Sequence, residues 1–408
     1  MPESVQYSLA QTPRKAKVAP ALLLIMAVGC GVSVANLYYS QPLLVEIGKT
    51  FHASSGQMGL ISMLTQVGFA MGLLFFVPLG DMRERRRLIL LMCIAVSIAL
   101  VGVANAKNLI WLAIASFILG LTTVIPQLIV PLAADMADAQ ERGKVVGTVM
   151  SGLLVGILLA RTVSGYVGNW FGWRTMYWLA AVLMLVLALV LRLLLPESKP
   201  ATALSYRKIM QSMWSLTKNH PLLWESSLMG AALFGTFSIF WTTLAFFLEY
   251  PPYHYGSHIV GLFGLVGVVG ASVAPLAGRI ADKHGPRLVA GIGTVITLVA
   301  YLAFLYLGHN LWGLVIGVIL LDAGVQGAHI SNQATIYSLQ PEASNRLNTV
   351  YMVSYFIGGA LGSALGAYAC SFEKWNGVGS LGLAFAGVGL ITWTAHRLRD
   401  RRLNKSTA

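Results

Sequence analysis

The stretch Gly278-Arg279-Ile280-Ala281-Asp282-Lys283-His284-Gly285-Pro286-Arg287 is short and charged, and it separates two apolar runs that are each long enough to cross a bilayer. A partial copy, Gly80-Asp81-Met82-Arg83-Glu84-Arg85-Arg86-Arg87, lies earlier in the chain by almost half of its 408 residues. A charged loop that recurs at half the chain length indicates duplication. We therefore interpret the sequence as two related halves of a membrane protein.

The composition agrees with a chain that is surrounded mostly by lipid. Charged residues make up 11% of the sequence and apolar residues 56%, whereas charged residues are about 25% of a typical soluble domain. A soluble protein of this length needs more polar surface than this composition supplies. The sequence therefore predicts an all-α membrane protein, since helices satisfy their own backbone hydrogen bonds in lipid.

Other function classes lack their signatures. The net charge of +13 does not indicate a nucleic-acid partner, because the basic residues lie in short segments between apolar runs. Cys30, Cys93 and Cys370 lie within apolar runs and have no metal-ligand spacing. The chain has no phosphate-binding Gly-x-x-x-x-Gly-Lys-Ser/Thr loop, no His-Glu-x-x-His helix and no Gly-x-Ser-x-Gly elbow. We expect no enzyme activity, no ATP-driven pumping, no cofactor and no metal.

Twelve segments are long and apolar enough to span a membrane. They cover residues 19–42, 54–79, 87–106, 109–133, 145–167, 174–196, 224–248, 257–278, 288–308, 311–333, 346–370 and 376–396. The longest polar stretch lies between the sixth and the seventh. We predict a cytoplasmic lead (1–18), a six-helix bundle (19–196), a cytoplasmic linker (197–222), a second six-helix bundle (223–396) and a basic cytoplasmic tail (397–408).

The orientation follows from the lysines and arginines in the short loops, which favour the cytoplasm. With the N-terminus in the cytoplasm, 22 of the 28 basic residues lie on that side and four on the other. This distribution predicts that both termini are cytoplasmic.

Two further patterns repeat between the halves. An acid precedes an arginine by four residues at Asp138–Arg142 and again at Glu342–Arg346, a spacing that suits a helical ion pair. Glycines three or four residues apart predict tight helix packing in the second, fifth, eighth and eleventh spans. These glycines are Gly68, Gly72, Gly152, Gly156, Gly261, Gly264, Gly267, Gly270, Gly358, Gly362 and Gly366.

The loop between the eighth and ninth spans resembles the loop signature of the major facilitator superfamily, Gly-x-x-Ala/Gly-Asp-Arg/Lys-x-Gly-Arg/Lys-Arg/Lys. The matching residues are Gly278, Ala281, Asp282, Lys283, Gly285 and Arg287, and Pro286 departs from the signature. In the first copy Gly80, Asp81, Arg85 and Arg86 match. Phe171-Gly172-Trp173-Arg174 also resembles a turn of this family. The resemblance covers nearly the whole chain and implies two pseudo-symmetric six-helix bundles that transport a small molecule.

The branch of the family is defined less well by the sequence. Gly156 and Gly165 fit the fifth-span motif of the drug:proton antiporters, but Ala160-Arg161 replaces its Gly-Pro. In the fourth span Ser116 stands where that branch carries an arginine, four residues before Gly120. The chain therefore resembles a twelve-helix efflux permease with atypical fourth and fifth spans.

Asp322 is the clearest candidate for coupling transport to protons. An ionisable side chain within a span costs about 2.5–3.5 kcal/mol to insert and therefore indicates a function. Gln326, His329 and Gln333 follow on the same helix face. We interpret Asp322 as a proton-binding carboxylate and His329 as a relay or substrate contact. The alternative is a buried hydrogen-bond network that only holds the helix in place.

Arg161, in the fifth span, keeps its charge when buried and so needs a partner. One hypothesis is that it pairs with Asp322 across the cavity in some state. The alternative is that it reaches the outer surface or bonds carbonyls of a neighbouring helix. In this family the first, fourth, seventh and tenth spans line the cavity, which suggests further substrate contacts. These are Asn36, Tyr39, Thr123, Gln127 and Trp241, together with Gln326 and Gln333 of the tenth span.

The paired loops are candidates for a conformational switch. We expect Asp81 to approach the start of the eleventh span near Arg346, and Asp282 that of the fifth, where a helix dipole adds about 0.3–1 kcal/mol. The better match of the second copy predicts that it matters at least as much as the first. The candidate switch residues are Gly80, Asp81, Arg85, Arg86, Arg142, Gly278, Asp282, Lys283, Gly285, Arg287 and Arg346.

The sequence thus predicts a monomeric secondary transporter of a bacterial inner membrane, which exports small organic molecules in exchange for protons. One alternative is uptake or exchange of a small anionic metabolite, which suits Arg161. An alternative of another class is a membrane receptor or sensor that does not transport.

Overall fold

The computed structural model describes residues 19–138, 140–198 and 205–406, and the regular structure within these ranges is entirely helical. The first half comprises α1 (Pro20–Ala35), α2 (Ser40–Phe51), α3 (Ser55–Met82), α4 (Arg85–Ala104), α5 (Leu109–Thr122), α6 (Ile125–Met136), α7 (Arg142–Phe171) and α8 (Trp173–Leu194). After α9 (Tyr206–Asn219), the second half comprises α10 (Pro221–Glu249), α11 (Ser257–Ala271), α12 (Ala274–His284), α13 (Pro286–Leu307), α14 (Leu311–Tyr337), the 3-10 helix η1 (Pro341–Ala343) and α15 (Ser344–Ser406).

Each of the twelve predicted spans coincides with helical residues of the described chain, although three of them cover two consecutive helices. Ten helical segments are long and apolar enough to cross a membrane, and the shorter apolar helix Ser257–Gly270 covers the start of the eighth predicted span. The last two predicted spans both lie in α15, which a kink at Lys374 divides. The chain is therefore an all-α membrane protein, while the predicted lead (1–18) lies outside the described residues.

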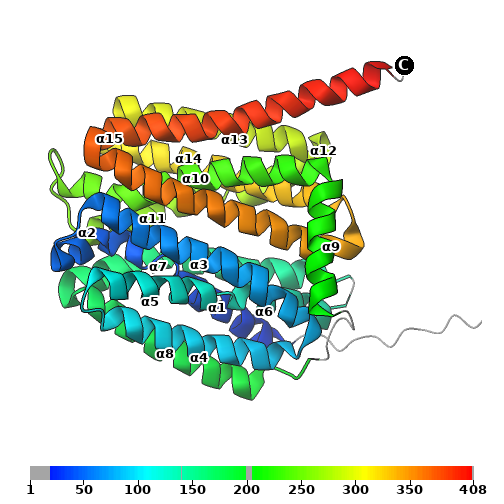
Figure 1. The fold of residues 1–408 in the computed structure, drawn as a ribbon, viewed down its shortest axis with the longest axis horizontal. Coiled ribbons are helices and arrows are strands. Elements are labelled where there is room, and N and C mark those ends of the chain that lie inside the picture. The colour runs from blue at the N-terminus through cyan, green and yellow to red at the C-terminus, as the bar shows by residue number, and fades with distance from the viewer. Residues whose placement is uncertain (1–18, 139, 199–204, 407–408) are drawn as a thin grey trace, which may run out of the picture.

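The two halves lie side by side, and α9 runs across both of them (Figure 1). The Tyr206 hydroxyl of α9 donates a hydrogen bond to the Phe75 carbonyl of α3, at 3.4 Å, and Arg346 of α15 donates one to Ser212 of α9. The predicted linker (197–222) thus contains a helix that contacts the first and the second half.

Three spans are interrupted near their middle. The first span breaks at residues 36–39 between α1 and α2, the fourth between α5 and α6, and the eighth between α11 and α12. A proline follows each break within the first three residues of the next helix, at Pro42, Pro126 and Pro275. Proline lacks the N–H that would continue the preceding helical ladder. Broken helices of this kind occur where transporters bind substrates at the middle of the membrane.

The halves meet along two seams, each formed by one span from each half. Along the α7–α11 seam, a Cβ added to Gly261 would lie only 2.6 Å from the Arg161 carbonyl oxygen. The two helices can approach this closely only because Gly261 has no side chain. Along the α3–α15 seam, Gln66 Nε2 donates to Ser363 Oγ at 2.7 Å. The predicted glycine packing of these spans is confirmed, and it brings the two backbones of the α7–α11 seam into direct contact.

Candidate functional site

Arg161 lies deep between the two halves, with only 1% of its surface exposed. Its Nε donates to Gln41 Oε1 of α2 at 2.7 Å. Its guanidinium carbon lies 3.9 Å from the ring centre of Trp241 and 4.9 Å from that of Tyr38. Because Trp241 belongs to the second half, this cation–π contact joins the halves. Arg161 therefore does not reach the outer surface, which was one predicted alternative.

Asp322 of α14 is also buried, with 2% of its surface exposed, and it lies against α11. A Cβ added to Gly267 would lie 2.9 Å from Asp322 Oδ2, and one added to Gly264 would lie 3.0 Å from the Cβ of Arg161. The two charged residues thus flank one glycine-lined strip of α11. A larger residue at either glycine would fill the space around them.

Arg161 and Asp322 form no ion pair in the described chain, although both lie against the same strip of α11. Arg161 Nη2 and Asp322 Oδ2 are both buried and without a hydrogen-bond partner, and so is the indole nitrogen of Trp241. Buried polar groups are nearly always satisfied, and leaving one unpaired costs about 1–3 kcal/mol. Two donors and one acceptor thus remain open in one buried region.

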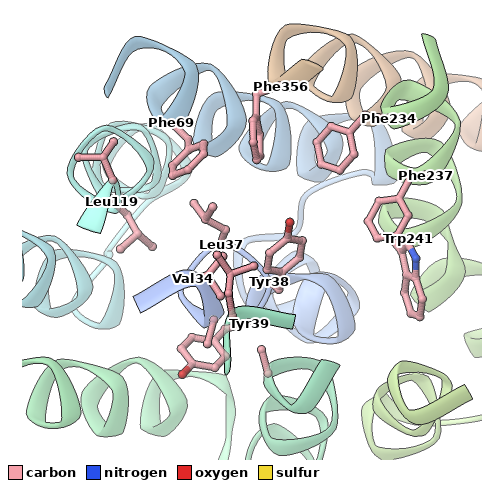
Figure 2. Packing of buried hydrophobic residues seen from close by; sticks show 14 of the residues in the cluster. Val34, Leu37, Tyr38, Tyr39, Phe69, Leu119, Phe234, Phe237, Trp241 and Phe356 are labelled. Atoms are coloured by element: carbon pink, nitrogen blue, oxygen red, sulfur yellow. The ribbon is translucent and has the colours of Figure 1, made fainter. Parts of the chain in front are cut away.

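Aromatic side chains surround this region. Figure 2 shows Phe234, Phe237 and Trp241 of α10, the rings of Phe69 and Phe356 on neighbouring helices, and Tyr38 directed among them. Tyr355 stacks on Phe234 with ring centres 4.1 Å apart. The open polar atoms are therefore set within an aromatic enclosure.

The predicted polar face of the tenth span points partly toward this enclosure and partly toward α15. His329 Nδ1 lies 3.0 Å from the Tyr351 hydroxyl, and its ring centre lies 4.6 Å from that of Tyr355. Further along, Gln333 Nε2 donates to Asn348 Oδ1 at 3.1 Å, and Gln326 is half-buried. His329 thus contacts Tyr351 and Tyr355 of α15.

Other predicted cavity residues have local partners. Asn36 donates to the Ser33 carbonyl and to Met184 Sδ, and Thr123 donates to the carbonyl of Leu119. Tyr39 points away from the centre that its neighbour Tyr38 approaches (Figure 2). Among the cavity residues predicted outside α14, Trp241 is the one that contacts the Arg161 guanidinium.

Sequence reasoning missed Gln41, Tyr38 and Tyr355. Pro42 signals the break that begins at Asn36, and this break turns Tyr38 rather than Tyr39 inward. Gln41 lies in the first turn of α2, directly after the break at residues 36–39. It could have been found as a polar residue next to Pro42.

The family is decided by the match to the Major Facilitator Superfamily, whose model covers residues 22–283 and 254–408. The chain belongs to the Major Facilitator Superfamily.

Similar proteins within this superfamily are transporters. The chain is 44% identical over 378 residues to the "Uncharacterized transporter YgaY" of Escherichia coli O157:H7, covering 92% of this chain and 96% of the relative. It is 33% identical to the "Probable transporter SCO4007" of Streptomyces coelicolor, covering 94% and 89%. A crystal structure of a bacterial homolog of the human lysosomal transporter Spinster, inward-facing and unoccupied, shares the fold with a TM-score of 0.75 at 18% identity, covering 94% and 97%.

The two superfamily loops have different surroundings. In the first copy, Arg85 is buried and donates to Asp81 at 3.0 Å, to Asp135 at 2.6 Å and to the Gly80 carbonyl. A small pocket beside this group is lined by Asp81, Gln127, Asn345 and other residues. Asp81 thus approaches the start of α15 as expected, but Arg346 binds Ser212 instead.

The second copy is exposed. Asp282, Lys283 and His284 end α12, and Gly285 has a φ of 89°, a left-handed conformation that favours glycine. Asp282 makes no ion pair within the described residues, so the expected contact with the start of α7 is not formed here. Of the remaining switch candidates, Arg86 donates to the Arg192 carbonyl, Arg142 donates to that of Ala134, and Arg287 lies 3.9 Å from Glu225.

The opposite end of the molecule is closed between the halves. Lys49 of α2 forms an ion pair with Glu249 of α10. Glu46 accepts a hydrogen bond from the Ser257 hydroxyl of α11 at 2.5 Å, and the same hydroxyl oxygen lies 3.1 Å from the Gly165 carbonyl oxygen. At the end that carries the charged loops, by contrast, a Cβ added to Gly147 or Gly278 would meet no atom within 4 Å. α7 and α12 therefore do not pack against each other at these two glycines.

Proposed function

We propose that this chain is a monomeric, proton-coupled secondary transporter that exports small organic molecules across a bacterial inner membrane. The observation that carries the proposal is that Arg161 and Asp322, one from each half, are both buried with unpartnered polar atoms beside the broken first and eighth spans. Substrates of transporters with this kind of architecture bind near the middle of the membrane between the repeats.

Asp322 provides the proton site in this mechanism. A buried carboxylate without a full set of partners is unfavourable as an anion, so either a proton or a cationic group of the substrate relieves it. The two compete for one carboxylate and cannot occupy it together. Competition of this kind produces antiport, and an inward proton gradient then drives the substrate outward.

Alternating access follows from the two ends. In the state described above, Lys49–Glu249 and Ser257–Glu46 hold the outer end together, while α7 and α12 do not pack against each other at Gly147 and Gly278 of the other end. Rocking of the halves about the α3–α15 and α7–α11 seams would break the outer contacts and bring α12 toward α7. The drug:proton antiporter resemblance and the orientation of the charged loops toward the cytoplasm support this direction.

The test uses the purified full-length chain in proteoliposomes that contain a pH-sensitive dye. External substrate from a panel of organic compounds enters down its gradient, and antiport then removes protons from the lumen, which becomes more alkaline. Asp322→Asn abolishes this pH change, whereas the matched exposed-site variant Glu342→Gln retains it. An unchanged pH signal in Asp322→Asn would overturn the assignment.

Uptake or exchange of an anionic metabolite is the second candidate, favoured by the open Nη2 atom of Arg161. The same assay separates the candidates. Proton symport acidifies the lumen, and simple exchange leaves its pH unchanged. A receptor that does not transport shows neither substrate entry nor a pH change.

A further inference from the structure

We propose that the Arg161–Asp322 region binds small zwitterions, in which one short apolar or aromatic body carries both a carboxylate and an ammonium group. This substrate class rests on the proposed transport function and deepens it. Three buried atoms carry the inference, namely Arg161 Nη2, Trp241 Nε1 and Asp322 Oδ2.

The two nitrogens form the anion-binding side. Arg161 stacks over Trp241 with 3.9 Å between the guanidinium carbon and the ring centre, so their free N–H groups lie near each other. Gln41 already occupies the Nε of Arg161 and fixes the plane of the guanidinium. A carboxylate can accept hydrogen bonds from several donors at once, and charge-assisted bonds to arginine are about twice as strong as neutral ones.

Asp322 forms the cation-binding side. Its Oδ2 can only accept hydrogen bonds while the group is ionised, and an ammonium group supplies up to three donors. No lysine or arginine pairs with Asp322 within the described residues, and Arg161 stops short of ion-pair distance. A ligand that carries opposite charges at its two ends would satisfy both residues without bringing them together.

The surroundings select the rest of the ligand. Tyr38, Phe237 and Trp241 present ring surfaces to the guanidinium, and Tyr355 lies next to them along α15. Aromatic walls of this kind favour an apolar body and exclude water from the charged ends. A simple anion would leave Asp322 unpaired, and a simple cation would leave the open Arg161 and Trp241 donors unpaired.

The experiment measures ligand-dependent thermal unfolding of the purified full-length chain with three matched probes. L-phenylalanine carries both charges, 3-phenylpropanoate lacks the ammonium group, and 2-phenylethylamine lacks the carboxylate. L-leucine with its corresponding acid and amine forms a second set. We expect the amino acid of at least one set to raise the unfolding temperature, with its two fragments about tenfold or more weaker, since each leaves a buried polar group unpaired.

Variants locate the binding to this region. Trp241→Phe keeps a ring beneath Arg161 but removes the indole N–H, so the affinity for the amino acid falls about tenfold. The matched variant Trp214→Phe, on the exposed face of α9, leaves it unchanged. If an acid binds as tightly as its amino acid, Asp322 has no role in binding. If an amine binds as tightly as its amino acid, Arg161 has none. If none of the six probes raises the unfolding temperature, the proposal is overturned.

The outcomes also separate this inference from the proposed function. If the vesicle assay detects Asp322-dependent proton movement with a compound that is not a zwitterion while all six probes fail, antiport stands and the substrate class falls. If an amino acid binds but drives no pH change, the binding site stands and proton coupling falls.

Discussion

Arg161 and Trp241 connect the two halves of the molecule through a stacked contact of 3.9 Å between the guanidinium carbon and the ring centre. Gln41 accepts a hydrogen bond from the same arginine. The guanidinium, which the fifth span carries, therefore contacts both the bent first span and the seventh span. A rearrangement of the halves cannot leave these contacts unchanged, so Arg161 is placed to sense the position of one half relative to the other.

Arg161→Lys should weaken both stability and transport. Lysine keeps the charge, but its compact ammonium group cannot reproduce the planar contact with Trp241 and the bond to Gln41 together. We expect a loss of about 1.5–3 kcal/mol from the charged hydrogen bond alone, seen as a lower unfolding temperature in detergent. Arg192→Lys, an exposed arginine on α8, is the control. Equal unfolding temperatures for both variants would contradict the role given to the buried guanidinium.

Gly261→Ala should disturb the seam between α7 and α11. The new Cβ would lie 2.6 Å from the Arg161 carbonyl oxygen, and backbone cannot move aside as a flexible side chain can. Overpacking of this kind costs about 1–3 kcal/mol. Gly278→Ala is the matched control, because a Cβ there meets no atom within 4 Å. The measurement compares the unfolding temperatures of the two alanine variants. If Gly261→Ala is as stable as Gly278→Ala, α7 and α11 can move apart enough to accept the added methyl group.

The helical architecture could be predicted from sequence because it depends on simple quantities. Length and apolarity locate the spans. The glycine spacing anticipated close helix packing in spans whose backbones do approach each other at Gly261 and Gly165. These features are local, so no knowledge of the three-dimensional arrangement was required.

The candidate site was harder to predict because it depends on rotation about helix axes and on contacts between distant segments. Asp322, Arg161 and Trp241 were found through their charge or size, but their relative positions depend on the glycine face of α11 between them. Tyr39 was predicted to line the cavity, but the first span bends at residues 36–39 before Pro42 and directs Tyr38 inward instead. Asp135 was missed as a partner of Arg85 because the two are 50 positions apart.

Arg85→Gln should destabilise the protein more than Lys283→Gln, although the second loop matches the family signature better. Arg85 is buried and binds Asp81, Asp135 and the Gly80 carbonyl, whereas Lys283 is exposed at the end of α12. We expect Arg85→Gln to lose about 1.5–3 kcal/mol and Lys283→Gln to remain within about 0.5 kcal/mol of the parent chain. Chemical unfolding in mild detergent measures both. The reverse ranking would support the expectation that the second copy matters at least as much as the first.

Reversing the charge at the outer end should shift the balance between outer-closed and outer-open states. Lys49→Glu places a second carboxylate opposite Glu249, and Lys49→Glu combined with Glu249→Lys restores an opposite pair. The Lys49 side chain is 66% exposed, so the pair contributes only about 0.2–1 kcal/mol. The population of the outer-open state should therefore rise by no more than about fivefold in the single variant and return in the double variant. Spin labels at the exposed positions Phe171 and Tyr250, one on each half, report the separation by pulsed electron resonance. High salt screens exposed charges and should reduce the difference between the variants. If the double variant does not reverse the shift, the outer end is held by the contact between Glu46 and Ser257 instead.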